Sequence, residues 1–405
     1  MSLFFAWRYL RSKKNTNAIN IIAWISMVAI GVVTAALVVV LSVFNGFEDM
    51  VKQMYGDFYA DLQVTATRGK WLNLSTEKLR KLQEVNGVAS VQPVIMERAI
   101  LLDQEDKSIV WLKGVSGQYA NYSGVPGHML RGNFFVGDSV NPRLVLGFGV
   151  EQSLQIIAGQ SPMPVTIYLP NPEAGPAADV STAMVSANAY TAGTFAVQQE
   201  FDEQYAFTHS SFLTYMLGLP QNQFTSIELF VKDKENAGNL GKEIGEIMGN
   251  GFVVKDRYQQ NQSLFSAMKT EKLIIYAISF LILVIAGFNI VSSLTMTVIE
   301  KQKDIAVLKA MGTSDETVRR IFLQLGILLA GIGAMAGFVL GVLICLGQQH
   351  FHWVKLGGQS FIIDYYPVAV RFADLLVVVS IVVCIAIIAA WLPAKRATMS
   401  YFSLR

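Results

Sequence analysis

Apolar residues gather in four long runs along the chain, separated by stretches of mixed polarity. The runs cover residues 19–44, 273–299, 321–349 and 375–393, and none of them contains a Lys, Arg, Asp or Glu. A helix needs about 20 residues to cross the hydrocarbon core of a bilayer. The pattern therefore predicts four transmembrane helices, with bounds at residues 19–46, 272–299, 317–349 and 372–393.

The segment between the first two runs alternates between strand-like and helix-like patterns, and its two ends look alike. A strand, a helix (STEKLRKLQEV, capped by Ser75 or Thr76) and a strand follow the first run. A second strand, helix and strand, in SIELFVK, KENAGNLGKEIGEIMG and FVVKD, precede the second run. We predict one α+β domain over residues 47–271, with βαβ units at 47–113 and 221–271 and a β-rich insertion at 114–220.

Composition and charge agree with a membrane protein and give its orientation. Of the residues, 52% are hydrophobic and 15% are charged, whereas soluble domains carry about 25% charged residues. Basic residues concentrate before the first run, between the second and third runs, and after the fourth. Because basic loops stay in the cytoplasm, we expect both termini and the 300–320 turn to be cytoplasmic and the large domain to lie outside.

The chain lacks the residue patterns of common catalytic sites. It has no G-x-x-x-x-G-K-[ST] nucleotide-binding loop and no G-x-S-x-G nucleophile motif. His350 and His352 would share one face of a strand, but no third ligand lies near them in the sequence. We therefore expect a chain that is not an enzyme, with no catalytic, cofactor or metal site of its own and no nucleic-acid partner.

A short charged and half-apolar segment, residues 300–316, follows the second run. Ile305, Leu308 and Met311 recur at spacing three, so we expect the second helix to continue into this segment and to stop at Gly312. Thr313 and Glu316 have the spacing of a capping box that would start the third transmembrane helix. The segment is either an interfacial helix on lipid headgroups or a docking element for a cytoplasmic partner.

Four stretches of the chain resemble a known family. They are AWRYLRSKK (6–14), LSVFNGFEDMV (41–51), AGFNIVSSLTMTVIEKQKDIAVLKAMGTSDETVRRIFLQLG (286–326) and LPAKRATMSYFSLR (392–405). These stretches are similar to the permease subunits of the lipoprotein-releasing ABC transporter, LolC and LolE, within the MacB/FtsX-type superfamily.

The resemblance implies a permease in the bacterial inner membrane with a periplasmic, porter-like domain. Such a permease extracts lipoproteins from the outer leaflet by mechanotransmission and hands them to a periplasmic lipoprotein carrier. ATP and Mg²⁺ would be bound by a separate LolD-like ATPase subunit, and the permease would pair with a second copy or a paralogue. Residues 1–18 would form an amphipathic elbow, 350–371 a periplasmic loop and 394–405 a cytoplasmic tail.

The resemblance also implies roles for individual residues. The helix that couples to the ATPase would use Glu300, Lys301, Lys303, Asp304, Ile305, Leu308, Lys309, Met311 and Gly312. The proline-rich stretch 170–186, whose composition alone indicates a flexible hairpin loop, would be an arm that binds the carrier through Pro170, Asn171, Pro172 and Pro176.

Apolar residues next to the first two spans suit the acyl chains of a lipid-anchored substrate, with membrane lipid as a second partner. They are Phe44, Phe47, Met50, Met54, Leu264, Phe265 and Met268, and packing between the domain and the helix ends is the alternative role. Gly333, Gly337 and Gly341 at spacing four permit close helix contact, either within the subunit or between two subunits.

Two other functions in the superfamily are compatible with the sequence. One is an FtsX-type regulator that activates a periplasmic cell-wall hydrolase. The other is a MacB-like efflux permease, although no ATPase motif is fused to this chain. A membrane-anchored scaffold without transport is an alternative from a different class.

Overall fold

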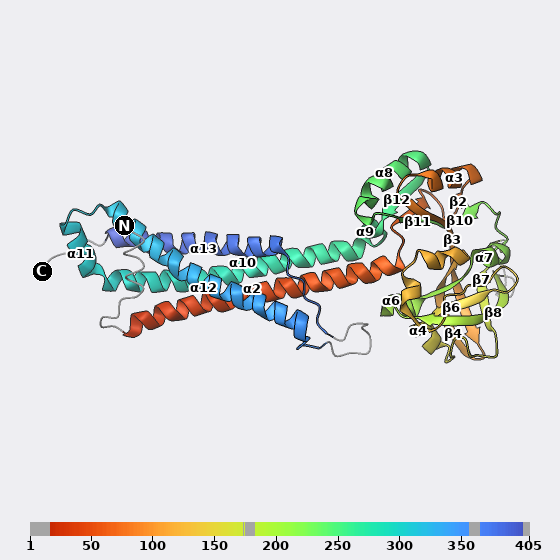
Figure 1. Ribbon diagram of the computed structural model, residues 1–405, viewed down its shortest axis with the longest axis horizontal. Helices are drawn as coiled ribbons and strands as arrows, with labels where there is room; N and C mark the ends of the chain where they lie inside the picture. The colour runs from red at the N-terminus through yellow and green to blue at the C-terminus, as the bar shows by residue number, and fades with distance from the viewer. Residues whose placement is uncertain (1–16, 173, 175–182, 356–364, 400–405) are drawn as a thin grey trace. The chain divides into compact units, whose positions relative to one another are not determined.

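The computed structural model describes residues 17–172, 174, 183–355 and 365–399, which form two units (Figure 1). The membrane unit comprises the described residues up to Met50, together with 266–355 and 365–399. The β-rich unit comprises the described residues from Val51 to Phe265. Residues 1–16 of the predicted elbow lie outside the described residues.

Four long helices contribute to the membrane unit, and each contains a stretch long and apolar enough to cross a membrane. They are α2 (Asn17–Phe58), α10 (Gln262–Glu300), α12 (Asp315–Phe351) and α13 (Phe372–Met399). Buried apolar side chains from α10, α12 and α13, such as Leu294, Phe322 and Ala390, form one cluster between them. In a bilayer such packing holds helices together mainly through van der Waals contact.

Helices α2 and α10 are longer than the spans that the apolar runs predict. α2 continues through GFEDMVKQMYGDF to Phe58, and α10 already begins at Gln262. Neither extension contains proline, and both contain good helix formers such as Glu, Met, Gln and Lys. The predicted domain bounds at 46/47 and 271/272 therefore fall inside continuous helices.

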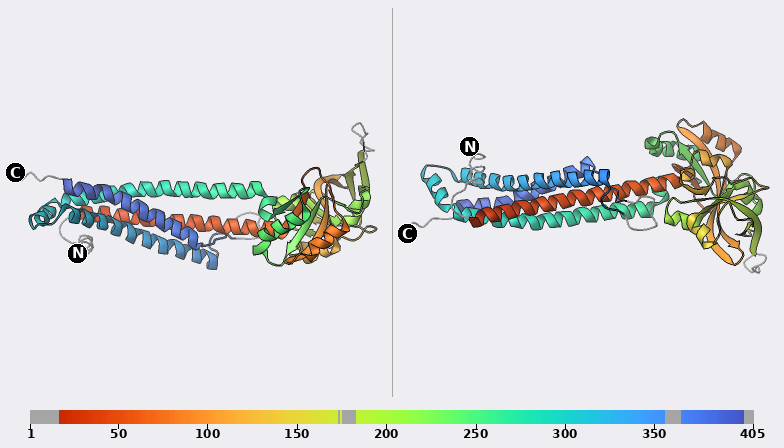
Figure 2. Two further views of the ribbon diagram at one scale, coloured as in Figure 1. Left: turned by 90° about the horizontal axis from the view of Figure 1, so that it is seen from above. Right: turned by 60° about the horizontal axis from the view of Figure 1, so that its bottom comes forward.

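A short helix, α11 (Gln302–Ala310), connects α10 to α12 at one end of the membrane unit (Figures 1 and 2). Lys301 separates the two helices with φ −86° and ψ 10°, outside the α-helical values, and α11 turns away from the axis of α10. The expectation that the second span runs straight into this segment was therefore wrong.

The N-cap of α12 is Ser314, whose side chain accepts a hydrogen bond from the backbone N–H of Thr317 (3.4 Å). The predicted capping box of Thr313 and Glu316 was wrong by one residue. The Glu316 side chain instead accepts a hydrogen bond from Arg320 (2.6 Å), one helical turn later.

The β-rich unit contains twelve strands among its described residues. They are β1 (Leu62–Ala66), β2 (Leu72–Asn73), β3 (Val88–Asp103), β4 (Asp106–Val115), β5 (Met129–Gly132), β6 (Arg143–Gly147), β7 (Val165–Pro170), β8 (Met184–Phe195), β9 (Tyr205–His209), β10 (Gln223–Phe224), β11 (Ser226–Val231) and β12 (Phe252–Asp256). Ten of them form one sheet in the order β12-β1-β11-β3-β4-β9-β6-β8-β5, with β7 beside β3 and β8. β2 and β10 pair separately.

Helices cover and connect the strands of this sheet. The α-helices are α3 (Thr76–Glu84), α4 (Phe148–Ser153), α6 (Gln199–Gln204), α7 (Ser210–Met216), α8 (Ala237–Met248) and α9 (Arg257–Gln260). The 3₁₀ helices are η1 (Gly117–Asn121), η2 (Val125–His128) and η3 (Lys234–Asn236). Ser75 caps α3 by accepting from the N–H of Lys78, one of the two predicted caps.

The two similar ends of the domain interleave in the sheet. β1, from the first end, pairs antiparallel with both β11 and β12 from the second end. α3 and α8 pack on these strands through Leu82, Leu240 and Ile244, which belong to one buried cluster. The predicted fold class, four membrane helices with a large α+β domain, is confirmed.

Strand β3 belongs to both halves of the sheet. Its first half pairs with β11, and its second half pairs with β4 and β7. The predicted insertion bound at 113/114 falls inside β4, whose final residues pair in parallel with β9. The sheet of the insertion therefore begins within β3, before the predicted bound.

A buried ion pair joins the two halves of the sheet. Lys113 on β4 and Glu228 on β11 are each 3% exposed, and their side chains pair at 2.8 Å. The Tyr119 hydroxyl on η1 donates to Glu228 (2.8 Å) and accepts from Lys113 (2.9 Å). Removing either charge would leave the other buried without its ion-pair partner, which would strongly destabilise the fold.

Candidate functional site

The apolar residues exposed on α11 are not the same set as those that recur at spacing three in the sequence. Ile305 is 5% exposed and belongs to the buried cluster that includes Val298 and Val318. Val307 and Met311 are 59% and 70% exposed. Val307 was not predicted as part of the docking surface because it falls outside the spacing-three pattern, yet it lies on the exposed side of α11.

Polar contacts fix α11 to its neighbours in the membrane unit. The Lys309 ammonium pairs with Asp315 at the start of α12 (2.8 Å) and donates to the carbonyl of Thr398 on α13 (3.3 Å). At the C-terminus of α11, Gly312 has a φ of 89°, and its N–H donates to the Lys309 carbonyl. Lys309 thus anchors the helix and is less available to a partner than its position in the sequence indicates.

The other residues predicted for α11 differ in exposure. Lys303, Asp304 and Gly312 are exposed, whereas Glu300, Lys301 and Leu308 are half-buried. Lys301 also pairs with Asp304 at 3.4 Å. The exposed side of α11 is therefore a small apolar surface of Val307 and Met311 beside charged residues.

The apolar residues predicted to meet acyl chains lie in both units and are largely packed. In the membrane unit Met50 is buried, and Phe44 and Met268 are half-buried. The half-buried ring of Phe47 meets the ring of Tyr366 edge-on, with centroids 5.7 Å apart.

In the β-rich unit, Met54, Leu264 and Phe265 are half-buried. The Phe265 ring lies edge-on to Tyr258 (4.9 Å) and Tyr55 (6.2 Å). These contacts are those expected of packing residues, and the half-buried side chains retain some surface.

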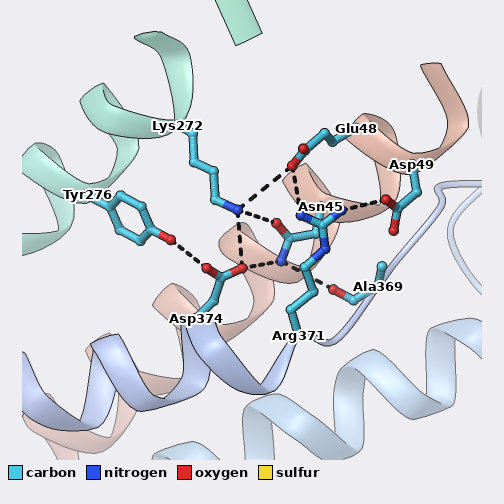
Figure 3. A network of polar contacts seen from close by, with 8 residues as sticks. All are labelled: Asn45, Glu48, Asp49, Lys272, Tyr276, Ala369, Arg371 and Asp374. Atoms are coloured by element: carbon cyan, nitrogen blue, oxygen red, sulfur yellow. Dashed lines mark hydrogen bonds and ion pairs between the residues drawn. The ribbon is translucent and has the colours of Figure 1, made fainter. Parts of the chain in front are cut away.

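A polar network connects α2, α10 and α13 in the membrane unit (Figure 3). Asp374 accepts hydrogen bonds from Asn45 (2.5 Å) and Tyr276 (2.5 Å), and Asn45 in turn accepts one from Lys272 (2.9 Å). Asn45 is 1% exposed and Asp374 is 7% exposed, so these groups are satisfied by one another rather than by water.

Arg371 holds the other side of this network. Its guanidinium donates to Glu48 (3.0 Å) and Asp49 (2.5 Å), both on α2, while Lys272 lies 3.8 Å from the Glu48 carboxylate. The same segment packs closely on α2, because a side chain at Gly46 would collide with the Pro367 carbonyl. This network was not predicted from the sequence, where its only local sign is a group of charged residues just outside the apolar runs.

The proline-rich stretch connects two antiparallel strands. Pro170 at the end of β7 pairs with Met184 at the start of β8, and the N–H of Asn171 donates to the Ala183 carbonyl (2.9 Å). Pro170, Asn171 and Pro172 thus stand at the base of a β-hairpin, whereas Pro176 lies outside the described residues.

The three glycines at spacing four face α2 within the membrane unit. A Cβ atom at Gly333 would lie 2.3 Å from the Met27 carbonyl oxygen, and one at Gly337 would lie 2.0 Å from that of Gly31. A Cβ atom at Gly341 would lie 2.9 Å from Val38. Of the two roles left open by the sequence, the structure shows contact within the subunit.

The histidines near the end of α12 do not lie on a strand. His350 is in the last turn of α12, and His352 is its C-cap, with a φ of 50°. Within the described ranges, no group of three or more His, Cys, Asp or Glu side chains could hold a metal ion.

Two family models together cover most of the chain. Residues 23–242, more than half of the chain, match the MacB-like periplasmic core domain, and residues 276–401 match the FtsX-like permease C-terminal domain. This chain belongs to the MacB/FtsX superfamily. It is accordingly an inner-membrane permease with a periplasmic domain, which the β-rich unit forms.

Relatives within this superfamily match the chain over almost its full length. The lipoprotein-releasing system transmembrane protein LolC of Neisseria meningitidis is 28% identical, with 97% of this chain and 96% of that protein covered. LolE of Haemophilus influenzae is 24% identical over the same shares, and LolC of Xylella fastidiosa is 25% identical over 98% and 96%. The periplasmic region of MacB from Actinobacillus actinomycetemcomitans is 15% identical, covers 53% of this chain and 97% of its own, and has a TM-score of 0.37.

Proposed function

We propose that this chain is the permease subunit of an ATP-driven transporter that extracts lipoproteins from the outer leaflet of the inner membrane and delivers them to a periplasmic carrier. The main support is the near full-length match to LolC and LolE proteins, whose names refer to lipoprotein release. The match includes both the spans and the periplasmic domain, so it covers the parts that extraction and delivery require.

Extraction of a lipid anchor needs an external energy source. Moving an acyl chain out of the bilayer costs about 0.8 kcal/mol for each CH₂ group, so several chains cost tens of kcal/mol unless an apolar site receives them. In this proposal a separate ATPase subunit binds ATP and Mg²⁺, and a second permease copy or paralogue completes the transporter. The half-buried apolar side chains beside the spans, such as Phe44 and Met268, would contact the acyl chains.

The exposed side of α11 is the proposed docking surface for the ATPase. Val307 and Met311 offer apolar area, and Lys303 and Asp304 offer charges at its edge. Ile305 and Lys309 hold α11 against the other helices, so a push on α11 would reach α10 and α12. The hairpin of β7 and β8 would contact the carrier.

Co-purification tests the proposal. The tagged chain is purified from its native membranes in mild detergent, and bound proteins are identified by mass spectrometry. We expect an ATPase subunit and triacylated lipoproteins. Val307→Asp should reduce the recovered ATPase at least tenfold, because burying an unpaired carboxylate in an apolar contact costs about 2 kcal/mol or more.

Val140→Asp is the matched control, since Val140 is 81% exposed in the β-rich unit and far from α11 in the sequence. This variant should retain the ATPase. Recovery of an ATPase with a cell-wall hydrolase and no lipoprotein would favour the FtsX-type regulator. Absence of any ATPase, or full retention by Val307→Asp, would contradict the docking role of α11.

A further inference from the structure

The β-rich unit contains a pocket of about 430 Å³ beside the last turns of α2. Its walls come from α2, from η3 and the start of α8, and from α9 and the residues that follow it. Lys52, Lys234 and Arg257 line it as cations, and Asp61 and Asp256 line it as anions. The lining therefore carries one more positive than negative formal charge.

Both carboxylates of the pocket already have partners. Asp61 pairs with Arg257 (2.9 Å) and accepts the N–H of Val231 (2.8 Å). Asp256 is the N-cap of α9 and accepts the N–H of Gln259 (2.7 Å). These contacts favour an anionic ligand over a cationic one, because a cation would compete for carboxylates that the fold uses.

Arg257 is placed to bind an anion. Its guanidinium lies over Gly56, where a Cβ atom would be 2.8 Å from Nη1. Its Nε is buried and has no hydrogen-bond acceptor within the described ranges. The Arg257 side chain as a whole is 25% exposed and lines the pocket, so its positive charge is available to an anion there.

The pocket also has an apolar wall, formed by Tyr55, Tyr258 and Phe265. Lys52 lies over the Tyr258 ring, with its ammonium 5.8 Å from the ring centroid. A free inorganic anion gains nothing from such a wall. A phosphodiester with attached glycerol and methylene groups fits both the cations and the rings.

Two residues of the pocket lie close in sequence to the ends of the apolar runs that are expected to cross the bilayer. Along α2, Lys52 follows the end of the first apolar run by about 12 Å at 1.5 Å per residue. Phe265 precedes the second apolar run by a similar length of α10. Phospholipid headgroups are therefore the phosphate source nearest to these residues in the proposed topology.

We propose that this pocket binds the phosphate group of a membrane phospholipid, with Lys52, Lys234 and Arg257 as its cationic contacts. The aromatic wall contacts the glycerol and the first methylene groups. This binding site does not depend on which cargo the transporter moves or on the ATPase.

Native mass spectrometry of the full chain in detergent tests the proposal with three probes: phosphatidylglycerol, diacylglycerol with the same acyl chains, and inorganic phosphate. Phosphatidylglycerol should bind at least tenfold more tightly than diacylglycerol. Lys52→Ala/Lys234→Ala should weaken phosphatidylglycerol binding about tenfold or more, because each Lys contributes about 1 kcal/mol to anionic-lipid binding. Arg68→Ala/Lys107→Ala, which removes two exposed cations elsewhere on the β-rich unit, should have no effect.

Hydrogen exchange locates the site. Phosphatidylglycerol should protect amides at 234–238 and 257–258, and the Lys52/Lys234 double variant should lose this protection. If the double variant fails to fold, the single change Lys234→Glu, at an exposed position, replaces it with the same expectation.

Three results would overturn the proposal. The first is unchanged lipid binding by the variants, and the second is equal binding of diacylglycerol. The third is displacement of phosphatidylglycerol by millimolar inorganic phosphate, which would make the pocket a site for a free anion.

Discussion

The close contact between α2 and α12 gives a sharp prediction for Gly337→Ala. The new Cβ atom would lie 2.0 Å from the carbonyl oxygen of Gly31. Real Cβ atoms essentially never approach another heavy atom more closely than 3.0 Å. The obstacle is backbone, so no flexible side chain can move aside. The two helices must therefore separate locally by at least 1 Å.

Separation of this size has a cost that can be estimated from the contacts along the seam. A radial gap of about 0.5–1 Å loses a quarter to a half of each van der Waals contact, which is worth about 0.1–0.2 kcal/mol. Gly333 and Gly341 belong to the same seam, so their contacts with α2 weaken too. With a few tens of atom pairs affected, the free energy of unfolding should fall by about 1–3 kcal/mol, the range of overpacked cores.

Gly331→Ala is the matched control on the same helix. A Cβ atom at Gly331 meets no atom within 4 Å, so this change should be neutral or stabilise α12 by up to about 1 kcal/mol through helix propensity. The assay is denaturant unfolding of the purified chain in detergent micelles, followed by tryptophan fluorescence. If Gly337→Ala unfolds at the same denaturant concentration as Gly331→Ala, the backbone contact between α2 and α12 is refuted.

Three further predictions concern buried polar groups. Lys113→Met should destabilise the chain by about 3–5 kcal/mol, because it leaves Glu228 buried without its cation, and Lys113→Met/Glu228→Leu should recover most of the loss in thermal melts; equal melting of the two variants would contradict this. Burial raises the pKa of Asp202 from 3.8 to about 6, so the folded state binds this proton more tightly, and stability should fall as pH rises through that interval. Asp202→Asn should flatten the fall and add about 1–2 kcal/mol at pH 7, and an unchanged slope in denaturant titrations from pH 4 to 7 would refute it. Asn45→Ala should lower the free energy of unfolding by about 1–3 kcal/mol, because Asp374 loses one of its hydrogen-bond donors and keeps only Tyr276 and Lys272, and unaltered denaturant unfolding would count against the network.

Local patterns predicted the spans and the strands and helices at the two ends of the domain, because apolar runs and strand alternation depend on neighbouring residues. The same patterns gave the wrong residue where two neighbouring residues fitted the pattern equally well. Thr313 and Ser314 both have a cap partner three residues later, and the structure uses Ser314. Ile305 and Val307 are both apolar, and only packing against the other helices decides which is buried. The continuation of α2 to Phe58 was not predicted, because the charged residues beyond the apolar run can be helical without forming part of an apolar pattern.

The polar network could not be predicted at all from neighbouring residues. Asn45, Lys272 and Asp374 are far apart in the sequence, and their contacts exist only once α2, α10 and α13 have packed. A charge just outside an apolar run is usually a solvated flank, so no residue in the network is conspicuous by itself.

The network and α11 stand at opposite ends of α10, which makes α10 the helix that connects them. Lys272 and Glu300 are separated by about 40 Å of one helix at 1.5 Å per residue. At the Lys272 end, α10 makes short hydrogen bonds to both neighbours, from the Lys272 ammonium to Asn45 on α2 (2.9 Å) and from the Tyr276 hydroxyl to Asp374 on α13 (2.5 Å). Because each of these hydrogen bonds involves a charged partner, and such bonds are stronger than neutral ones, they fix this end of α10 to both α2 and α13. A displacement of α10 relative to α2 and α13 would therefore have to break both of these hydrogen bonds.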